Sequence, residues 1–423
     1  MPFSPIQYQN WPLPQGVVDL FFDDAAAKRD LEQELRQLFR TWGYGELIPP
    51  TFEYADTLAS EGGTQLAEDM YRFVDRDGRT LALRPDLTIP AARVVGTRLF
   101  DQPMPLRLCY TGSVFRYEAP QAGRQREFTQ AGFELFGAAS PEADAEVLAL
   151  TAGALRLSQV EGFRIVIGQL DFVRGLLGET DASPEYLVEL TNAIDRKNLA
   201  DLEVLVDSLG AAGALRNALL ALPRLQGGAS VLDEAADFCL NEAMTAALGR
   251  LQDIHLLLDG YGLDSVVDYD LGETRGMEYY TGISFKAYAP GLGFAISSGG
   301  RYDDLVGHFG PSQPAVGCAL WLDRILLVRQ RQGRIGPGTR PDLVIAAADN
   351  QDCLGLMADL RRGGFQIELE LSGRQGNELR QYAAERGIPR SAVCAGDGQV
   401  TLYIGETEKN LGIDEVLRET EAW

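Results

Sequence analysis

The chain is 423 residues long, 45% of its residues are hydrophobic, and its formal net charge at pH 7 is −23. That length predicts two or three domains with sizeable hydrophobic cores. The strongly acidic balance disfavours a broad surface for nucleic acid or another polyanion.

Five cysteines are scattered along the sequence, and none of them forms a C-x-x-C pair. This spacing predicts a reducing compartment and no structural zinc site. The N-terminus lacks a basic stretch followed by an apolar one, and no uncharged apolar run reaches membrane-spanning length. We therefore expect a cytoplasmic protein that has no membrane partner.

The first predicted element is a helix that Asp23 or Asp24 caps and that Gly43 ends. Its apolar residues recur with helical spacing at Leu31, Leu35, Leu38, Phe39 and Trp42. The sequence YGELIPPTFEY that follows is strand-like. Because Pro49 and Pro50 interrupt it, we expect this strand at the edge of a sheet or in a distorted position.

The next informative segment is LALRPDLTIPAARVV, residues 81–95. Taken alone, its Arg-Pro-Asp sequence is typical of a turn. On an extended segment, Asp86 and Thr88 face the same way because side chains alternate with a period of two. A carboxylate beside a hydroxyl suits an ammonium group, which needs a negative charge and several acceptors.

A pair of strands is predicted between Arg107 and Gly137, joined by a loop from Ala119 to Arg124. One face of the second strand is mainly apolar and carries Thr129, Ala131, Phe133 and Leu135. The other face is mixed and carries Arg126, Phe128, Gln130, Gly132, Glu134 and Phe136. Two interpretations of this mixed face stay open: a solvated surface with cross-strand ion pairs, or a pocket in which Gly132 leaves room for a ligand.

Helical patterns dominate from about residue 166 to residue 268, and we find no chemical motif among them. A Gly/Arg/Pro-rich connector, QRQGRIGPGTRPD, then marks a boundary near residue 335. The βα pattern after it predicts a small α/β domain. Residues 341–423 hold 8 basic and 15 acidic residues, a balance of −7, which makes a poor surface for RNA.

Three segments resemble the motifs of the histidyl branch of the class II aminoacyl-tRNA synthetases. FRYEAPQAGRQREFTQAGFE resembles motif 2, PAVGCALWLDRILLV resembles motif 3, and the first helix with its proline-interrupted strand resembles motif 1. The resemblance implies an α+β fold, with an antiparallel sheet flanked by helices in a core domain of residues 1–330. It also implies a helical insertion at about 166–268 and a reduced anticodon-binding domain at 340–423.

The resemblance extends to a pocket for histidine. In that family the segment matching RPDLT holds the α-amino group, and the block matching ETRGMEYYTGISFKAY supplies an arginine for the carboxylate and tyrosines for the imidazole. Carried over residue by residue, the implied histidine-binding set is Asp86, Thr88, Arg116, Gln130, Glu134, Arg275, Tyr279 and Tyr280. We expect no catalytic residue, no cofactor and no metal in this chain.

Four positions depart from the synthetase pattern. Asp86 and Leu87 stand where the family usually has glutamate followed by glycine. Arg324 stands where motif 3 has the arginine that clamps adenine, but Trp321 stands where the family has a glycine. If the indole points inward, it fills the space for adenosine. A histidine of motif 2 is replaced by Thr129. The sequence therefore predicts an intact histidine pocket beside a damaged ATP pocket.

These departures favour the synthetase-like regulatory subunits of ATP phosphoribosyltransferase, the first enzyme of histidine biosynthesis, over a histidyl-tRNA synthetase, which remains the alternative. A stand-alone histidine sensor is a third interpretation. Membership of the regulatory family implies allosteric control by L-histidine and a short catalytic chain as partner, in a complex of four plus four chains. It also implies a homodimer through the synthetase-like core and no binding of tRNA.

Overall fold

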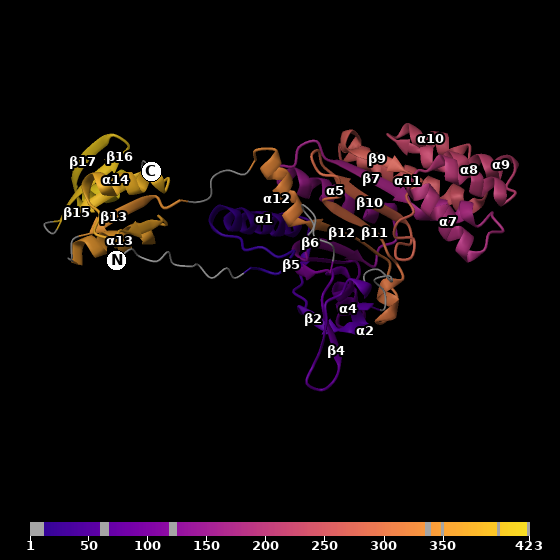
Figure 1. Ribbon diagram of the computed structural model, residues 1–423, viewed down its shortest axis with the longest axis horizontal. Helices are drawn as coiled ribbons and strands as arrows, with labels where there is room; N and C mark the ends of the chain where they lie inside the picture. The colour runs from indigo at the N-terminus through magenta and orange to yellow at the C-terminus, as the bar shows by residue number, and fades with distance from the viewer. Residues whose placement is uncertain are drawn as a thin grey trace, which may run out of the picture. The chain divides into compact units, whose positions relative to one another are not determined.

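The computed structural model describes residues 12–59, 67–117, 125–334, 340–347, 351–395 and 398–420. The chain divides into two compact units (Figure 1). One comprises Ala27–Ile335 with the residues up to Leu20, and the other comprises Gly336–Trp423 with Phe21–Ala26. In these described ranges, no helix has the length and apolar character needed to cross a membrane.

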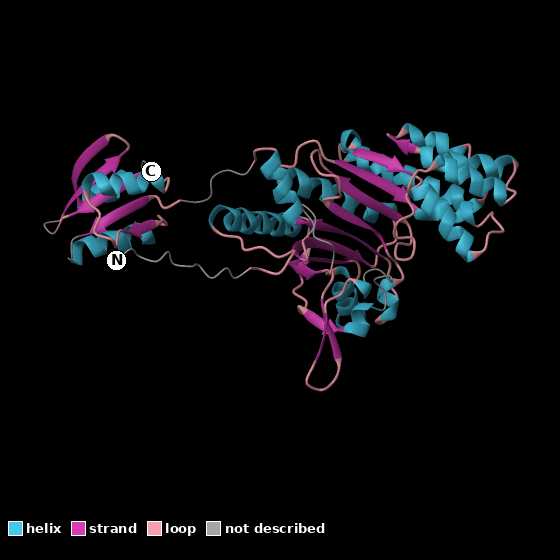
Figure 2. Ribbon diagram, viewed as in Figure 1, coloured by secondary structure: helices cyan, strands magenta, loops and turns pink. Residues whose placement is uncertain are grey.

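A nine-stranded sheet forms the centre of the larger unit (Figure 2). Its strands, in the order in which they lie side by side, are β1 (Gly45–Glu46), β5 (Leu106–Phe115), β6 (Glu127–Phe136), β12 (Ala315–Trp321), β11 (Ser297–Arg301), β10 (Ile283–Tyr288), β7 (Arg164–Gln169), β9 (Val267–Asp270) and β8 (Gln226–Gly227). Neighbouring strands are antiparallel, except that β1 runs parallel to β5 and β7 runs parallel to β9. The predicted α+β fold is confirmed, with a sheet that is antiparallel at most of its pairings.

The first predicted helix is confirmed as α1 (Phe22–Thr41), but it begins at Phe22, so Asp23 and Asp24 lie in its first turn and not at the position that caps it. Its side chains Leu31, Leu35 and Phe39 are fully buried, and Gly43 follows with a left-handed φ of 81° that ends the helix. The strand after it is confirmed as the short β1, which lies at the edge of the sheet just before the two prolines.

The predicted pair of strands is confirmed as β5 and β6, which are antiparallel. The loop expected between them lies outside the described residues. The apolar side chains of one face of β6 are buried in the largest core, together with residues of α1, of α5 (Pro141–Leu157) and of α12 (Leu322–Arg331). The opposite face of β6 contributes Phe128 and Phe136 to a second core, into which α4 (Thr88–Arg98) packs.

Smaller elements complete this second core. A three-stranded sheet has the order β2 (Phe52–Tyr54), β4 (Thr80–Leu83) and β3 (Arg72–Val74). The helix α2 (Ala55–Ala59) and the 3-10 turn η3 (Leu305–His308) lie beside it, and η3 packs on α4. The mixed face of β6 is therefore covered, which removes the interpretation of a solvated sheet face.

The helical insertion is narrower than predicted. Its helices are α6 (Leu170–Leu177), α7 (Pro184–Asp195), α8 (Leu199–Ser208), α9 (Gly213–Ala221), α10 (Ser230–Ala236) and α11 (Glu242–Gly260), with the 3-10 turns η1 (Leu222–Arg224) and η2 (Asp264–Val266). The expected ends, near residues 166 and 268, lie instead in β7 and β9 of the main sheet. Short apolar runs such as RIVIG do not distinguish a buried strand from a helix by periodicity, which explains the difference.

The smaller unit contains a five-stranded sheet in the order β14 (Ile367–Leu369), β13 (Leu343–Ala347), β15 (Arg390–Cys394), β16 (Gln399–Ile404) and β17 (Thr407–Gly412). Its helices are α13 (Gln351–Arg362), α14 (Gly376–Glu385) and α15 (Ile413–Glu419). The structure also joins Cys353 to Cys394 in a disulfide. The sequence did not predict this pair, because the two residues are 41 positions apart and are brought together only by the packing of α13 on this sheet.

Candidate functional site

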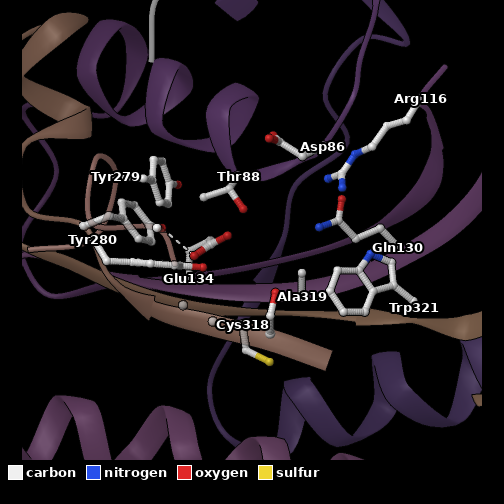
Figure 3. A pocket seen from close by; sticks show the side chains of 15 residues that line it. Asp86, Thr88, Arg116, Gln130, Glu134, Tyr279, Tyr280, Cys318, Ala319 and Trp321 are labelled. Atoms are coloured by element: carbon white, nitrogen blue, oxygen red, sulfur yellow. Dashed lines mark hydrogen bonds between the residues drawn. The ribbon is translucent and has the colours of Figure 1, made fainter. Parts of the chain in front are cut away.

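A cavity of about 250 Å³ opens on the mixed face of β6, beside the start of α4 (Figure 3). This volume is just below the roughly 300–1,000 Å³ of sites for drug-sized ligands, so the cavity suits a smaller molecule. Its lining residues come from six separate segments and are Asp86, Thr88, Arg116, Gln130, Glu134, Gly276, Tyr279, Tyr280, Ser298, Gly299, Tyr302, Gly317, Cys318, Ala319 and Trp321.

Glu134 forms the floor of the cavity and is 1% exposed. Its Oε1 accepts a hydrogen bond of 2.6 Å from the Tyr110 hydroxyl, and its Oε2 accepts one from the Tyr302 hydroxyl. Space for the carboxyl group exists because the facing residue of β12 is Gly317, where a Cβ atom would lie 1.5 Å from Oε2. The ring of Tyr110 in turn occupies the space above Gly132, so that glycine admits a tyrosine and not a ligand.

Burial raises the pKa of Glu134 to about 7, although the hydrogen bonds from the two tyrosines favour its ionised form. Burial, and the neighbouring charge of Glu134, hold the pKa values of Tyr110 and Tyr302 above their ordinary value. Both phenols therefore remain hydrogen-bond donors. Glu134 is able to accept a further hydrogen bond from a ligand and to exchange a proton near neutral pH.

We expect Glu134→Gln to flatten the dependence of folding stability on pH. The carboxyl group binds its proton more tightly in the folded chain, with a pKa of about 7 against an ordinary 4.5. Its contribution to stability is therefore fully present below pH 4.5 and is lost as the pH rises through 7, a change of roughly 3 kcal/mol in the free energy of unfolding. Urea unfolding at about pH 5 and about pH 8 measures this difference between the two proteins. An exposed control, Glu234→Gln, should keep the slope of the parent chain, and an unchanged slope in Glu134→Gln would contradict the assignment.

Aromatic rings form the wall of the cavity beside Glu134. The ring of Tyr279 stacks on that of Tyr302 with a centroid distance of 5.5 Å, and it meets Tyr280 edge-on at 4.9 Å. The ring of Tyr280 lies against Gly300, where a Cβ atom would approach to 2.7 Å. From α6, Arg174 donates a hydrogen bond to the carbonyl oxygen of Tyr280 and fixes the backbone behind the ring. A flat ring can pack against such a wall.

The structure brings Asp86 and Thr88 into the cavity, but not on the extended segment that the sequence predicted. Thr88 is the first residue of α4, and Leu87 before it has nearly helical dihedral angles. The carboxylate of Asp86 accepts a hydrogen bond of 3.0 Å from the backbone of Ile89, and the Thr88 hydroxyl lies 3.2 Å from that of Tyr110.

Among the residues that the structure describes, Arg116 contributes the one guanidinium that lines this cavity. Its Nε donates a 2.8 Å hydrogen bond to the carbonyl oxygen of Pro85, and its plane lies 5.5 Å from the ring of Phe128. Burial raises the pKa of Asp86, while the nearby Arg116 lowers it. The cavity therefore offers a carboxylate, Asp86, to an ammonium group of a ligand and a guanidinium, Arg116, to an anionic group of the same ligand.

Gln130 and Trp321 lie beside Arg116 at the end of the cavity away from Tyr280 (Figure 3). The indole points inward, which settles the question that the sequence left open. The guanidinium of Arg324 lies 4.3 Å from the centre of the Trp321 ring, so the indole covers one face of this guanidinium.

The structure places Arg275 outside the cavity, which corrects the carboxylate role that the resemblance implied. Its side chain is 62% exposed, and it pairs with Asp195 of α7 at 2.8 Å. The sequence missed Tyr110, Tyr302 and Gly317. Tyr110 could have been predicted from the alternation of side chains in the two strands, because this residue of β5 lies directly across from Gly132 of β6. The other two come from loops or strands whose register the sequence does not specify.

Comparison with known proteins identifies the family to which the chain is similar. Residues 16–325 match the histidyl-tRNA synthetase family. The chain is 38% identical over 410 residues to the ATP phosphoribosyltransferase regulatory subunit of Acetivibrio thermocellus, across 96% of this chain and 98% of that protein. It is 41% identical over 379 residues to the protein of the same name from Moorella thermoacetica, across 89% and 96%.

Two solved structures are similar over most of their length. One, described as an ATP phosphoribosyltransferase regulatory subunit/histidyl-tRNA synthetase from Bacillus halodurans, has a TM-score of 0.80 at 27% identity and covers 91% of this chain and 98% of that one. The other, histidyl-tRNA synthetase from Nostoc sp. PCC 7120, has a TM-score of 0.81 at 20% identity over 98% and 100% of the two chains, a likeness of fold alone.

Proposed function

This chain belongs to the family of ATP phosphoribosyltransferase regulatory subunits, and from that membership we propose that it senses L-histidine for a short catalytic subunit of that enzyme. The observation that carries the proposal is the cavity itself. Two carboxylates, one guanidinium and a wall of tyrosines converge in about 250 Å³. Feedback control is then a coupling free energy between this cavity and the catalytic site of the partner.

Each group of L-histidine has a partner of suitable chemistry in the proposed complex. The imidazole packs against the wall of tyrosine rings and donates an N–H to Glu134. The ammonium group is bound by Asp86 and Thr88, which line the same space. The carboxylate faces Arg116, which replaces Arg275 in this role because it is the guanidinium that lines the cavity.

The same features favour regulation over aminoacylation. Adenylate formation requires an adenine held in a fixed orientation, and orientation supplies much of the rate of such reactions. Trp321 occupies the face of Arg324 against which an adenine would stack. Because protein interiors are close-packed, this volume is not recovered by relaxation. We therefore propose that the chain does not activate histidine with ATP. The acidic balance of residues 341–423 supports the further proposal that it does not bind tRNA.

The assembly belongs to the same proposal. The family resemblance supports a homodimer through the synthetase-like core and a cytoplasmic complex of four regulatory with four catalytic chains. Isologous pairing is the commonest oligomer symmetry.

Calorimetry with L-histidine tests the binding site. Gln130 is buried and lines the cavity beside Arg116, so we assign it to the carboxylate of the ligand as well. We expect Gln130→Ala and Glu134→Ala to weaken binding by about ten- to 150-fold each, since each variant removes a buried polar partner of the ligand. Gln381→Ala, at an exposed position on α14, is the matched control and should bind as tightly as the parent chain. Equal affinity in all four proteins would remove the assignment of the cavity to histidine.

A further inference from the structure

The aromatic wall of the cavity proposed for L-histidine also borders a second cavity. Tyr279 and Tyr280 line the first cavity beside Glu134, and Figure 3 shows the two rings next to each other there. The same two tyrosines line a second space of about 400 Å³, which is further bounded by α6, by η3 and by Met277. Because both cavities reach these tyrosines, close packing alone does not hold them in place.

The backbone behind the two rings belongs to no regular element. It lies in the connection between β9 and β10, where Gly276 has a left-handed φ of 84°. The carbonyl oxygen of Gly276 accepts hydrogen bonds of 2.9 and 2.8 Å from the N–H groups of Tyr279 and Tyr280. The carbonyl oxygens of Met277 and Tyr280 take no part in this turn. The partners of these two oxygens therefore matter, since a connection with few backbone hydrogen bonds opens easily.

One arginine of α6 satisfies both carbonyl groups. Nη2 of Arg174 donates one hydrogen bond to the oxygen of Met277 and another to that of Tyr280. A guanidinium nitrogen carries two hydrogens in a fixed planar geometry, so this single atom serves two acceptors. Nη1 of the same side chain donates a 2.9 Å hydrogen bond to Oδ1 of Asp171, which limits rotation of the guanidinium plane.

The helix that carries Arg174 is firmly anchored. Its side chains Phe172, Val173 and Leu176 are at most 1% exposed and belong to the largest core. The side chain of Arg174, by contrast, is 35% exposed and lines the second cavity. The helix α6 is therefore a rigid support from which Arg174 holds the turn behind the tyrosine rings.

We propose that Arg174 is a positioning residue that places the rings of Tyr279 and Tyr280 before the ligand arrives. Arg174 does not line the cavity proposed for L-histidine, so it acts through the two tyrosines. This inference rests on the proposed function, since the ligand is L-histidine. Without Arg174 the wall is in place in only a fraction of the molecules, and the apparent affinity falls by that fraction. A wall in place in about one molecule in ten corresponds to a loss of about tenfold.

Calorimetry with L-histidine compares the parent chain with Arg174→Ala and with a matched variant, Arg216→Ala. Arg216 of α9 has a similarly exposed side chain, at 33%, but it pairs with the acidic side chains of Asp207 and Glu203. We expect Arg174→Ala to bind about tenfold more weakly and Arg216→Ala to bind as tightly as the parent. Parental affinity in Arg174→Ala, or an equal loss in both variants, would overturn the inference.

Amide hydrogen exchange in the absence of ligand measures the order of the wall directly. In Arg174→Ala we expect peptides that cover residues 276–282 to exchange faster than in the parent, and peptides from α4 and β6 to exchange as before. Saturation with L-histidine should restore the protection of residues 276–282, because the ligand selects molecules in which the wall is in place. Unchanged exchange of this segment would overturn the inference. Faster exchange throughout the chain would also overturn it, since that result indicates a merely structural role.

A conservative variant keeps the inference testable if Arg174→Ala does not fold. Arg174→Lys retains the positive charge but not the planar fork, so we expect residues 276–282 to exchange faster than in the parent, and parental exchange would overturn the inference. A parent chain that binds no L-histidine would instead refute the proposed function. The exchange comparison without ligand would still test the wall in that case, so the two failures are distinguishable.

Discussion

Gly317→Ala is expected to reduce the affinity for L-histidine by about 100-fold, the loss of a charge-assisted hydrogen bond. The new methyl group would lie 1.5 Å from Oε2 of Glu134 and 2.8 Å from the carbonyl oxygen of Phe133. The side chain of Glu134 must therefore leave its position between the two tyrosines. Calorimetry with L-histidine measures the result.

The change at Gly317 is also expected to destabilise the fold by about 1–3 kcal/mol, as overpacking of a close-packed interior does. Gly249→Ala is the matched control, because a Cβ atom at this position of α11 meets nothing within 4 Å. In a helix interior alanine is more favourable than glycine, so the control should be at least as stable as the parent and bind L-histidine normally. A Gly317→Ala protein with parental affinity would contradict the position assigned to Glu134.

Asp144→Ala is expected to produce the largest loss of stability, about 3–5 kcal/mol in the free energy of unfolding. Asp144 lies on α5 and is 0% exposed. Its Oδ1 accepts hydrogen bonds of 2.9 and 2.6 Å from Arg301 on β11, and its Oδ2 accepts bonds of 2.9 and 2.5 Å from Arg250 on α11. Removing the carboxylate leaves Arg301, which is 3% exposed, without its main counter-charge.

Urea unfolding measures this loss, and an exposed ion pair supplies the control. Asp207 and Arg216 are 57% and 33% exposed in their side chains and lie 3.0 Å apart. Exposed pairs contribute about 0–1 kcal/mol, so Asp207→Ala should change stability by no more than that. A similar small effect for Asp144→Ala would show that the buried cluster does not hold α5, α11 and the sheet together.

Periodicity in the sequence was sufficient to predict features that depend on the alternation of side chains within a single helix or strand. The spacing of Leu31, Leu35 and Phe39 predicted α1, and the alternation along residues 127–136 predicted which face of β6 meets the core. The pairing of Gln130 with Glu134 on one face followed from the same period of two. These predictions depend only on neighbours along one element.

Predictions that depend on distant packing were wrong or missing. Arg275 was expected to bind the carboxylate of a ligand. In the structure its guanidinium pairs with Asp195, a residue 80 positions earlier in the chain. Tyr302 joins the site only because β11 and β12 place its loop beside Glu134. The direction of Trp321 was undecidable from the sequence, since it depends on how Arg324 packs at the start of α12.

The most direct test of the account is the rate of phosphoribosyl-ATP formation by a short catalytic subunit that is mixed with this chain and titrated with L-histidine. With the parent chain, we expect the rate to depend on histidine concentration. With Glu134→Ala, the same response should require about ten- to 150-fold more histidine. The account would be contradicted by a rate that changes neither on addition of this chain nor on addition of histidine. An identical response to histidine with the parent chain and with Glu134→Ala would also contradict it.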